Sequence, residues 1–124
     1  MATAHETLQV KSSREPEEVR PFQARGHVDV WHLASGDAGI GTFEPGWRWS
    51  QDVKPMAGTD SCQVRHIGYV MSGRMTIAMD DGSEAELGPG DVFELPPGHD
   101  GWVVGDEPCV MLDFGGLSGY AKPH

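Results

Sequence analysis

The apolar residues of this chain occur in short runs that end at tight turns. From position 27 onward, runs rich in Val, Ile, Met and aromatic residues stop at Gly, Pro, Asp or Ser. Short apolar or alternating runs bounded by such residues are typical of β-strands. The pattern predicts strands at 27–34, 39–43, 63–71, 75–79, 84–87, 92–95, 102–104 and 110–114.

Turn residues between these runs indicate how neighbouring strands connect. Ser72 and Gly73 separate two apolar runs, so we expect a hairpin between the strands at 63–71 and 75–79. Segment 47–56 is predicted to be irregular or strand-like, and no segment shows a convincing helical period. Short, evenly spaced strands favour a closed antiparallel barrel or jelly roll.

The length of the chain is sufficient for one domain. The 124 residues include 17 Gly and 9 Pro, in agreement with many turns around a single core. Residues 1–22 are weakly patterned and are predicted to form an N-terminal arm. Its Leu8 and Val10 are candidates to pair with a partner subunit, so a homodimer is expected. Residues 23–118 are assigned to the barrel and 119–124 to a C-terminal tail.

The charge of the chain excludes several classes of partner, and its cysteine content indicates reduced thiols. With 9 Lys and Arg against 19 Asp and Glu, the formal net charge is −10. Nucleic acid and anionic membranes need clustered cations, so neither is an expected partner. The sequence has no basic-then-apolar leader and no apolar run of membrane-spanning length, so a cytoplasmic protein is expected. Cys62 and Cys109 fit no disulfide framework and are predicted to be reduced thiols.

The most informative segment is 88–100, which reads GPGDVFELPPGHD. Its first residues form a tight turn, and a short strand follows. Pro96, Pro97 and Gly98 then end that strand abruptly, because proline fixes φ and glycine permits positive φ. The second turn delivers His99 to the end of a β-structure, a common position for a ligand or metal site.

This segment resembles the second sequence motif of the cupins, in which Gly, five residues, Pro, one residue, Gly and two residues precede a metal-binding His. Gly90, Pro96 and Gly98 fit the motif. The histidine position is occupied by Gly101, whereas His99 directly follows Gly98. The resemblance implies an all-β double-stranded β-helix, a jelly-roll barrel, and extends over roughly 37–114.

The first cupin motif also has a counterpart with substituted ligands. It runs His, one residue, His, three or four residues, Glu, six residues, Gly. Counting back from Gly73 places His66 at the Glu position, and Asp60 and Cys62 at the two His positions. The resemblance is therefore strong for the fold and weak for the chemistry, because each usual ligand is replaced.

Strand parity brings the candidate ligands together if the pairing has no bulge. Asp60, Cys62 and His66 then share one face, and His99 shares the parity of Gly101. If these faces point inward, the barrel interior holds a carboxylate, a thiol and two imidazoles. That set suits a divalent transition metal such as zinc, iron, nickel or copper.

Structural roles for the same residues remain open. His66 can be a core histidine bonded to Asp60 or Tyr69, and Cys62 can be a small buried apolar residue. His99 can lie at an exposed turn. Asp60 can be an exposed loop residue.

Aromatic residues near these positions are candidates for contacts with a small-molecule ligand. Tyr69 and Trp102 flank the candidate site, and Trp49 and Asp52 belong to a segment with Arg48 that can wall a pocket. Each can equally belong to the core or cap the barrel.

Two classes of function fit the sequence. The first is a metal-dependent oxygenase, isomerase or lyase acting on a small polar or aromatic molecule. The second is a metal-free ligand-binding or sensor barrel without catalysis, since the fold alone does not decide between them.

Overall fold

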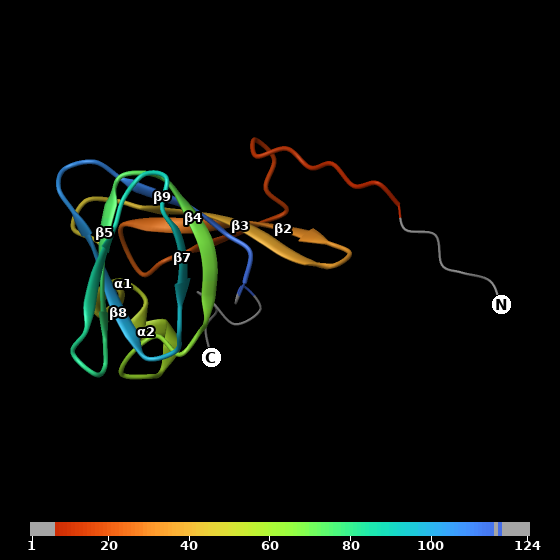
Figure 1. Ribbon diagram of the computed structural model, residues 1–124. Helices are drawn as coiled ribbons and strands as arrows, with labels where there is room; N and C mark the ends of the chain where they lie inside the picture. The colour runs from red at the N-terminus through yellow and green to blue at the C-terminus, as the bar shows by residue number, and fades with distance from the viewer. Residues whose placement is uncertain (1–6, 116, 118–124) are drawn as a thin grey trace.

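The structure is a computed structural model and describes residues 7–115 and 117. The chain forms two antiparallel sheets that enclose the core (Figure 1). One sheet has six strands in the order β1-β2-β3-β9-β4-β7, and the other has three in the order β6-β5-β8. The strands are β1 (Glu18–Pro21), β2 (Gly26–Leu33), β3 (Gly36–Phe43), β4 (His66–Ser72), β5 (Arg74–Met79), β6 (Glu84–Leu87), β7 (Val92–Leu95), β8 (His99–Val104) and β9 (Cys109–Asp113). The all-β prediction is confirmed.

The hairpin predicted at Ser72 and Gly73 is wrong. β4 pairs with β7 and β9, whereas β5 pairs with β6 and β8, so this turn carries the chain from one sheet to the other. Gly73 has φ of 76°, and a Cβ at this residue would lie 2.2 Å from the carbonyl oxygen of Pro108. Glycine is therefore needed where the crossing chain touches the start of β9.

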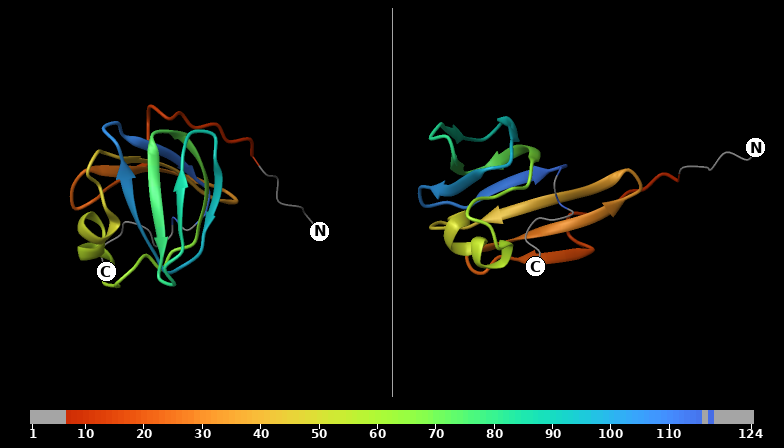
Figure 2. Two further views of the ribbon diagram at one scale, coloured as in Figure 1. Left: turned by 60° about the vertical axis from the view of Figure 1, so that its left-hand side comes forward. Right: turned by 90° about the horizontal axis from the view of Figure 1, so that it is seen from below.

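Segment 47–56 differs from the expected irregular or strand-like structure. Two one-turn helices, α1 (Trp49–Asp52) and α2 (Lys54–Ala57), connect β3 to β4. The Asp52 carboxylate accepts a hydrogen bond from the backbone N–H of Arg48 at 3.0 Å, which supports the first turn. Gly58 ends α2 in the left-handed conformation, with φ of 76°. Helices this short contain too few residues to show an apolar period. α1 packs beside β8 (Figure 2).

Alternation along the strands places one set of side chains inside the barrel. In β8 the buried positions are His99, Gly101 and Val103, so the predicted shared parity of His99 and Gly101 is confirmed. In β4 the buried positions include His66 and Val70. Both sheets therefore line one interior, in which His66 and His99 lie among apolar side chains.

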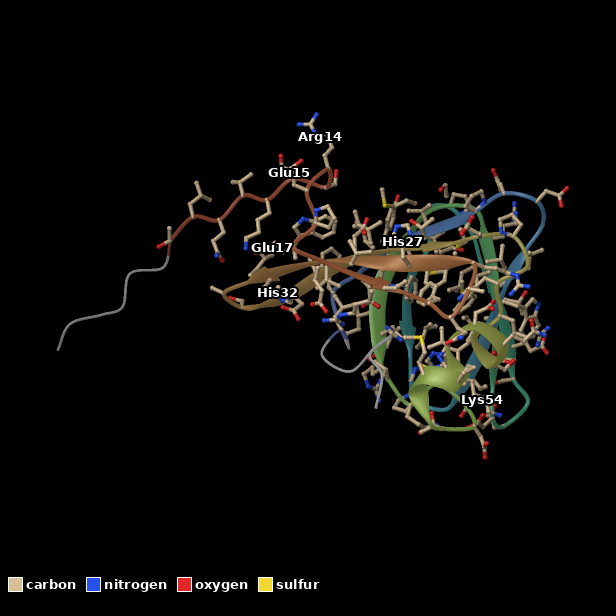
Figure 3. The ribbon with its side chains drawn as sticks, turned by 180° about the vertical axis from the view of Figure 1, so that it is seen from behind. Arg14, Glu15, Glu17, His27, His32 and Lys54 are labelled. Carbon is tan, nitrogen blue, oxygen red and sulfur yellow. The ribbon has the colours of Figure 1, made fainter. Side chains whose placement is uncertain are left out.

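Part of the predicted N-terminal arm belongs to the large sheet. β1 pairs with β2, so the sheet begins at Glu18, inside the segment 1–22 assigned to the arm. The Trp31 indole N–H donates to the carbonyl oxygens of Ser12 and Glu15, at 2.9 and 3.1 Å, and ties the arm to β2. Figure 3 shows the arm passing Glu15 before it reaches the sheet. The tail assigned to 119–124 lies outside the described residues.

Within the described part of the chain, no helix is long and apolar enough to cross a bilayer.

Candidate metal centre

Three side chains that commonly bind transition metals meet inside the barrel. Cys62, His66 and His99 each offer one donor atom, and these atoms all lie within 4.8 Å of one another. The three residues are 2%, 5% and 4% exposed. Buried polar side chains need partners, so such a cluster calls for a chemical explanation.

Backbone pairing fixes Cys62 opposite His99. The Cys62 N–H donates to the carbonyl oxygen of His99 at 2.7 Å, and the His99 N–H donates back to that of Cys62 at 3.2 Å. His99 is the first residue of β8, and His66 is the first residue of β4. The three side chains therefore come from strand ends and one isolated bridge, which the sheets hold in place.

The His66 ring is oriented from both sides. Its Nδ1 atom lies 2.6 Å from Oδ2 of Asp113, and its Nε2 atom lies 3.7 Å from Sγ of Cys62. Asp113 is the last residue of β9, which pairs with β4. The ionised carboxylate is only an acceptor, so Nδ1–H donates to it and Nε2 faces the thiol.

The His99 ring has a fixed tautomer as well. Its Nδ1 atom lies 2.7 Å from the carbonyl oxygen of Pro96. A carbonyl oxygen has no proton, so Nδ1–H must donate, and the lone pair of neutral His99 is on Nε2. The rings of His66 and His99 meet in an edge arrangement, with centroids 5.7 Å apart and an interplanar angle of 67°.

Electrostatics favour a thiolate beside an imidazolium in the metal-free cluster. Burial by itself raises the pKa of Cys62, but hydrogen bonds and positive charge from His66 and His99 outweigh it and lower this pKa to about 6. Burial likewise lowers the pKa of His66, but Asp113 and then Cys62 raise it to about 9. The deprotonated thiol is the form that binds metals.

The donor set fits a small divalent transition metal. A tetrahedral zinc ion, with bonds of about 2.3 Å to sulfur and about 2.0 Å to nitrogen, holds a sulfur and a nitrogen ligand about 3.6 Å apart. The Cys62–His66 separation of 3.7 Å is close to that value. Asp113 and the Pro96 carbonyl supply the outer hydrogen bonds that metal-binding histidines usually make.

A small cavity adjoins the cluster. It leaves about 40 Å³ open to the centres of water molecules, and His66, His99 and Asp113 are part of its wall. The remaining wall is mostly apolar or aromatic and includes Trp47 and Trp49. Three protein ligands beside such a cavity resemble the open arrangement of catalytic metal sites more than the closed arrangement of structural ones.

Asp60 is not brought to the cluster. Its side chain is fully exposed, and one carboxylate oxygen lies 3.6 Å from Nζ of Lys54. The parity argument required a strand over 60–66, whereas β4 begins only at His66 and Cys62 makes an isolated bridge. Irregular backbone does not preserve alternation, so Asp60 faces solvent while Cys62 faces inward.

The glycine at the usual cupin histidine position lies close to the ends of two core side chains. A Cβ on Gly101 would meet Cδ1 of Ile77 at 3.0 Å and Sδ of Met75 at 3.5 Å. His99 lies two residues earlier on the same strand face and projects into the barrel. A shift of two residues thus keeps an imidazole inside.

The four residues that the sequence offered for contact with a small-molecule ligand lie in different environments. Trp49 is buried and lines the cavity, whereas Tyr69 is partly exposed on the outer side of β4. Trp102 stacks beneath the Arg48 guanidinium, 4.3 Å from the ring centroid. Asp52 is buried, and its Oδ1 atom accepts from Arg25 at 2.7 Å. Of these four, only Trp49 lies in the cavity wall.

One contributor, Asp113, was missed in the sequence, and the role of a second, Trp47, stayed open between two alternatives. Asp113 shares the parity of the inward residues Cys109 and Met111, a signal that could have placed its carboxylate inside. Trp47 belongs, with Trp49, to the segment expected either to wall a pocket or to cap the barrel, and the structure places it in the cavity wall. Neither residue belongs to the motif positions on which the candidate ligands were chosen.

Two antiparallel sheets around an interior with buried histidines define a small jelly-roll barrel with a candidate metal centre. The family model described as "Cupin domain" matches residues 53–115, which is more than half of the chain. The chain belongs to the cupin domain family. No curated protein matches the chain significantly in sequence.

Solved structures confirm the fold. KdgF from Halomonas sp. is 21% identical, with a TM-score of 0.61 over 86% of this chain and 91% of that one. A protein of unknown function from Acidithiobacillus ferrooxidans is 20% identical, with a TM-score of 0.58 over 84% and 92%. A protein of unknown function from Rhizobium leguminosarum is 17% identical, with a TM-score of 0.59 over 95% and 99%. At these identities the similarity concerns the fold.

Proposed function

We propose that Cys62, His66 and His99 hold a divalent transition metal, for which zinc is the best match. The observation that carries the proposal is the convergence of three buried donor atoms within 4.8 Å. Thiolate with imidazole is the donor set of zinc sites, and it also accommodates iron, nickel or copper. Asp113 is not a ligand in this proposal and acts by orienting His66.

The metal and the cavity together form a binding site for a small molecule. Three protein ligands leave a four-coordinate ion with one position for water or for an oxygen of the ligand. When bound, the metal would supply Lewis acidity to that oxygen. The protein holds the two rings in fixed tautomers, keeps the thiol deprotonated and surrounds the site with apolar side chains that limit water. Lewis-acid chemistry of the isomerase or lyase type fits this donor set.

A metal-free ligand-binding barrel is the second candidate. It is favoured by one observation, the continuous hydrogen-bonded series from Asp113 through His66 to Cys62. A thiolate, an imidazolium and a carboxylate satisfy one another without an ion. Metal content separates the two candidates.

We also propose that the protein is a homodimer through the outer face of the six-stranded sheet. Exposed apolar side chains lie side by side there, since Tyr69 pairs with Val92 and the Phe114 N–H bonds the carbonyl oxygen of Ile67. Met71 continues the row along β4. Contiguous exposed apolar residues of this kind mark interaction surfaces.

The position of the N-terminal arm supports a second copy of the chain as the partner that covers this apolar row. A groove of about 360 Å³ between the arm and the sheet is lined by Val10, Trp31, Leu33 and Leu112, and Leu112 pairs with Tyr69. The arm and the apolar row are therefore one continuous surface. Such a surface can pair with its own copy about a two-fold axis.

The experiment that tests the metal proposal is elemental analysis of protein purified without a histidine tag, next to variants of the three ligands. A near-stoichiometric transition metal that is lost in the variants supports the metal site. Metal-free protein, even after incubation with zinc, iron, nickel and copper, supports the second candidate.

A further inference from the structure

Two tryptophans in the cavity wall have buried indole N–H groups that find no hydrogen-bond partner among the described residues. These donors are the Nε1 atoms of Trp47 and Trp49. The side chains are 3% and 2% exposed. Trp31 differs, because its indole N–H donates to two carbonyl oxygens of the arm.

Such donors are unusual in a folded protein. A buried N–H that has lost its hydrogen bonds to water is nearly always paired with protein or with ordered water. Two unpaired indoles, two residues apart, therefore indicate a partner that the described residues do not provide.

Trp47 and Trp49 are both among the residues that line the cavity, as are His66 and His99. No Lys or Arg occurs among the described residues that line this cavity, and the other wall residues are mostly apolar. Trp47 is held by Phe43, with ring centroids 4.6 Å apart in an edge arrangement, and by Phe22 at 5.5 Å. The position of its indole is thus fixed by aromatic packing before a ligand enters.

We propose that Trp47 and Trp49 donate their indole N–H groups to an oxygen of a small, otherwise apolar molecule. This inference rests on the proposed small-molecule site and does not require the metal. An indole N–H only donates, so the molecule must supply lone pairs, as a carbonyl or a carboxylate oxygen does. A ligand whose polar group is an ammonium has no acceptor for these donors.

The size of the cavity bounds the molecule. The cavity leaves about 40 Å³ open to the centres of water molecules. Each water needs on the order of 10–15 Å³ of such space, so the cavity accommodates about three waters. A molecule of about five or six non-hydrogen atoms occupies a similar space. Water is the competing occupant, and the test must distinguish it from an organic ligand.

The test observes the four indole N–H signals by NMR in protein labelled with ¹⁵N-tryptophan, before and after removal of bound metal. The probes are 2-butanone, butyrate, butylammonium and 2-methyl-1-butene. The first two carry an acceptor oxygen, the third carries only donors, and the last is the apolar isostere of the ketone. Phenylalanine substitutions assign the signals.

We expect 2-butanone or butyrate to shift the signals of Trp47 and Trp49 downfield and to leave the Trp31 signal unchanged. A shift by the ketone alone identifies a neutral carbonyl ligand, and a shift by butyrate identifies a carboxylate. Trp47→Phe and Trp49→Phe should each weaken binding of that probe by roughly three- to tenfold, the effect of one neutral hydrogen bond. Trp102→Phe, whose ring lies under Arg48, is the matched control and should leave binding unchanged.

Two results overturn the proposal. The first is that neither oxygen-bearing probe moves the two indole signals, which leaves water as their partner. The second is that 2-methyl-1-butene binds as tightly as 2-butanone. Because the signals are read in wild-type protein, poor folding of a variant does not block the test. Failure of the metal proposal is recognised separately, by elemental analysis, while indole binding persists in the metal-free protein.

Discussion

The Nδ1 atom of His66 lies 2.6 Å from Oδ2 of Asp113. Asp113, the last residue of β9, therefore sets the orientation and the proton position of the imidazole of His66, the first residue of β4. The opposite nitrogen of that ring faces Cys62 at 3.7 Å. This arrangement explains how a cupin barrel without the usual histidine and glutamate ligands retains an organised interior. A carboxylate outside the cluster fixes one imidazole, and the Pro96 carbonyl fixes the other.

Replacing Asp113 with Asn should weaken metal binding without unfolding the protein. Asparagine keeps an oxygen for the Gly115 N–H, which now bonds Oδ1 at 2.9 Å. Its NH₂ group would face Nδ1 of His66 as a donor and favour the tautomer with the proton on Nε2. Loss of such an outer partner typically costs 10–100-fold in metal affinity, to be measured by competition with a chelator.

The matched control for this substitution is Asp37→Asn. Asp37 also bonds a histidine, His32, at 2.9 Å, but the pair lies on the exposed end of β2 and β3. Its substitution should leave metal affinity unchanged. Equal affinity in wild type and Asp113→Asn would contradict the positioning role of Asp113.

The Cys62 thiol should ionise at unusually low pH in metal-free protein. Its pKa is lowered to about 6, against the ordinary thiol value of about 8.5, because His66 and His99 stabilise the thiolate against the effect of burial. Since the thiolate forms above the pKa, its ultraviolet absorbance should increase as the pH is raised from 5 to 7. Wild-type spectra corrected with those of Cys62→Ser give this titration.

Cys109 is the internal reference in that experiment. Burial raises its pKa to about 12, so it should contribute no thiolate signal below pH 9. A midpoint above pH 8 for the Cys62 signal would show that the histidines do not stabilise the thiolate.

Substitution of the outer face of β4 should dissociate the proposed dimer. Met71→Glu and Tyr69→Glu place charge in the exposed apolar row. Sedimentation equilibrium should give a dimer mass for wild type and a monomer mass for both variants, with unchanged circular dichroism. Gln63→Glu, a change on the loop before β4, is the charge-matched control. A wild-type monomer at micromolar concentration would contradict the dimer proposal.

Gly73→Ala should be strongly destabilising because two costs combine. The residue has positive φ, and the new Cβ would lie 2.2 Å from the Pro108 carbonyl oxygen. We expect a loss of at least about 3 kcal/mol in the free energy of unfolding. Gly82→Ala is the control, because Gly82 has φ of 92° and open space around its Cβ position, so that only strain of about 1 kcal/mol applies. Equal losses in urea unfolding would contradict the close crossing at Gly73.

The fold could be predicted from the sequence because its strands are short, apolar and bounded by Gly and Pro. The connection at Gly73 could not, because a glycine between two apolar runs suits both a hairpin and a crossing between sheets. The close approach of Gly73 to Pro108, a residue distant in the chain, distinguishes the crossing from a hairpin. The helices in 49–57 were missed since one turn contains too few residues to display a period.

The candidate site was predictable to the extent that side chains alternate on strands. His99 and His66 lie on strands and point inward as parity suggested. Asp60 lies where the chain is irregular, and there parity has no meaning. Cys62 faces inward because its backbone pairs with His99, a long-range contact that a sequence pattern does not reveal.

The central claim is the metal centre, and the most direct test is metal content in untagged protein. Wild type, His66→Ala, His99→Ala and Cys62→Ser are compared by elemental analysis after equilibration with each candidate metal. His32→Ala, a change on the exposed part of β2, is the matched histidine control. We predict about one equivalent of a transition metal in wild type and in His32→Ala, and a loss in the other three variants with the fold retained. Wild-type protein that binds no metal, or cluster variants that keep full occupancy, would contradict the account.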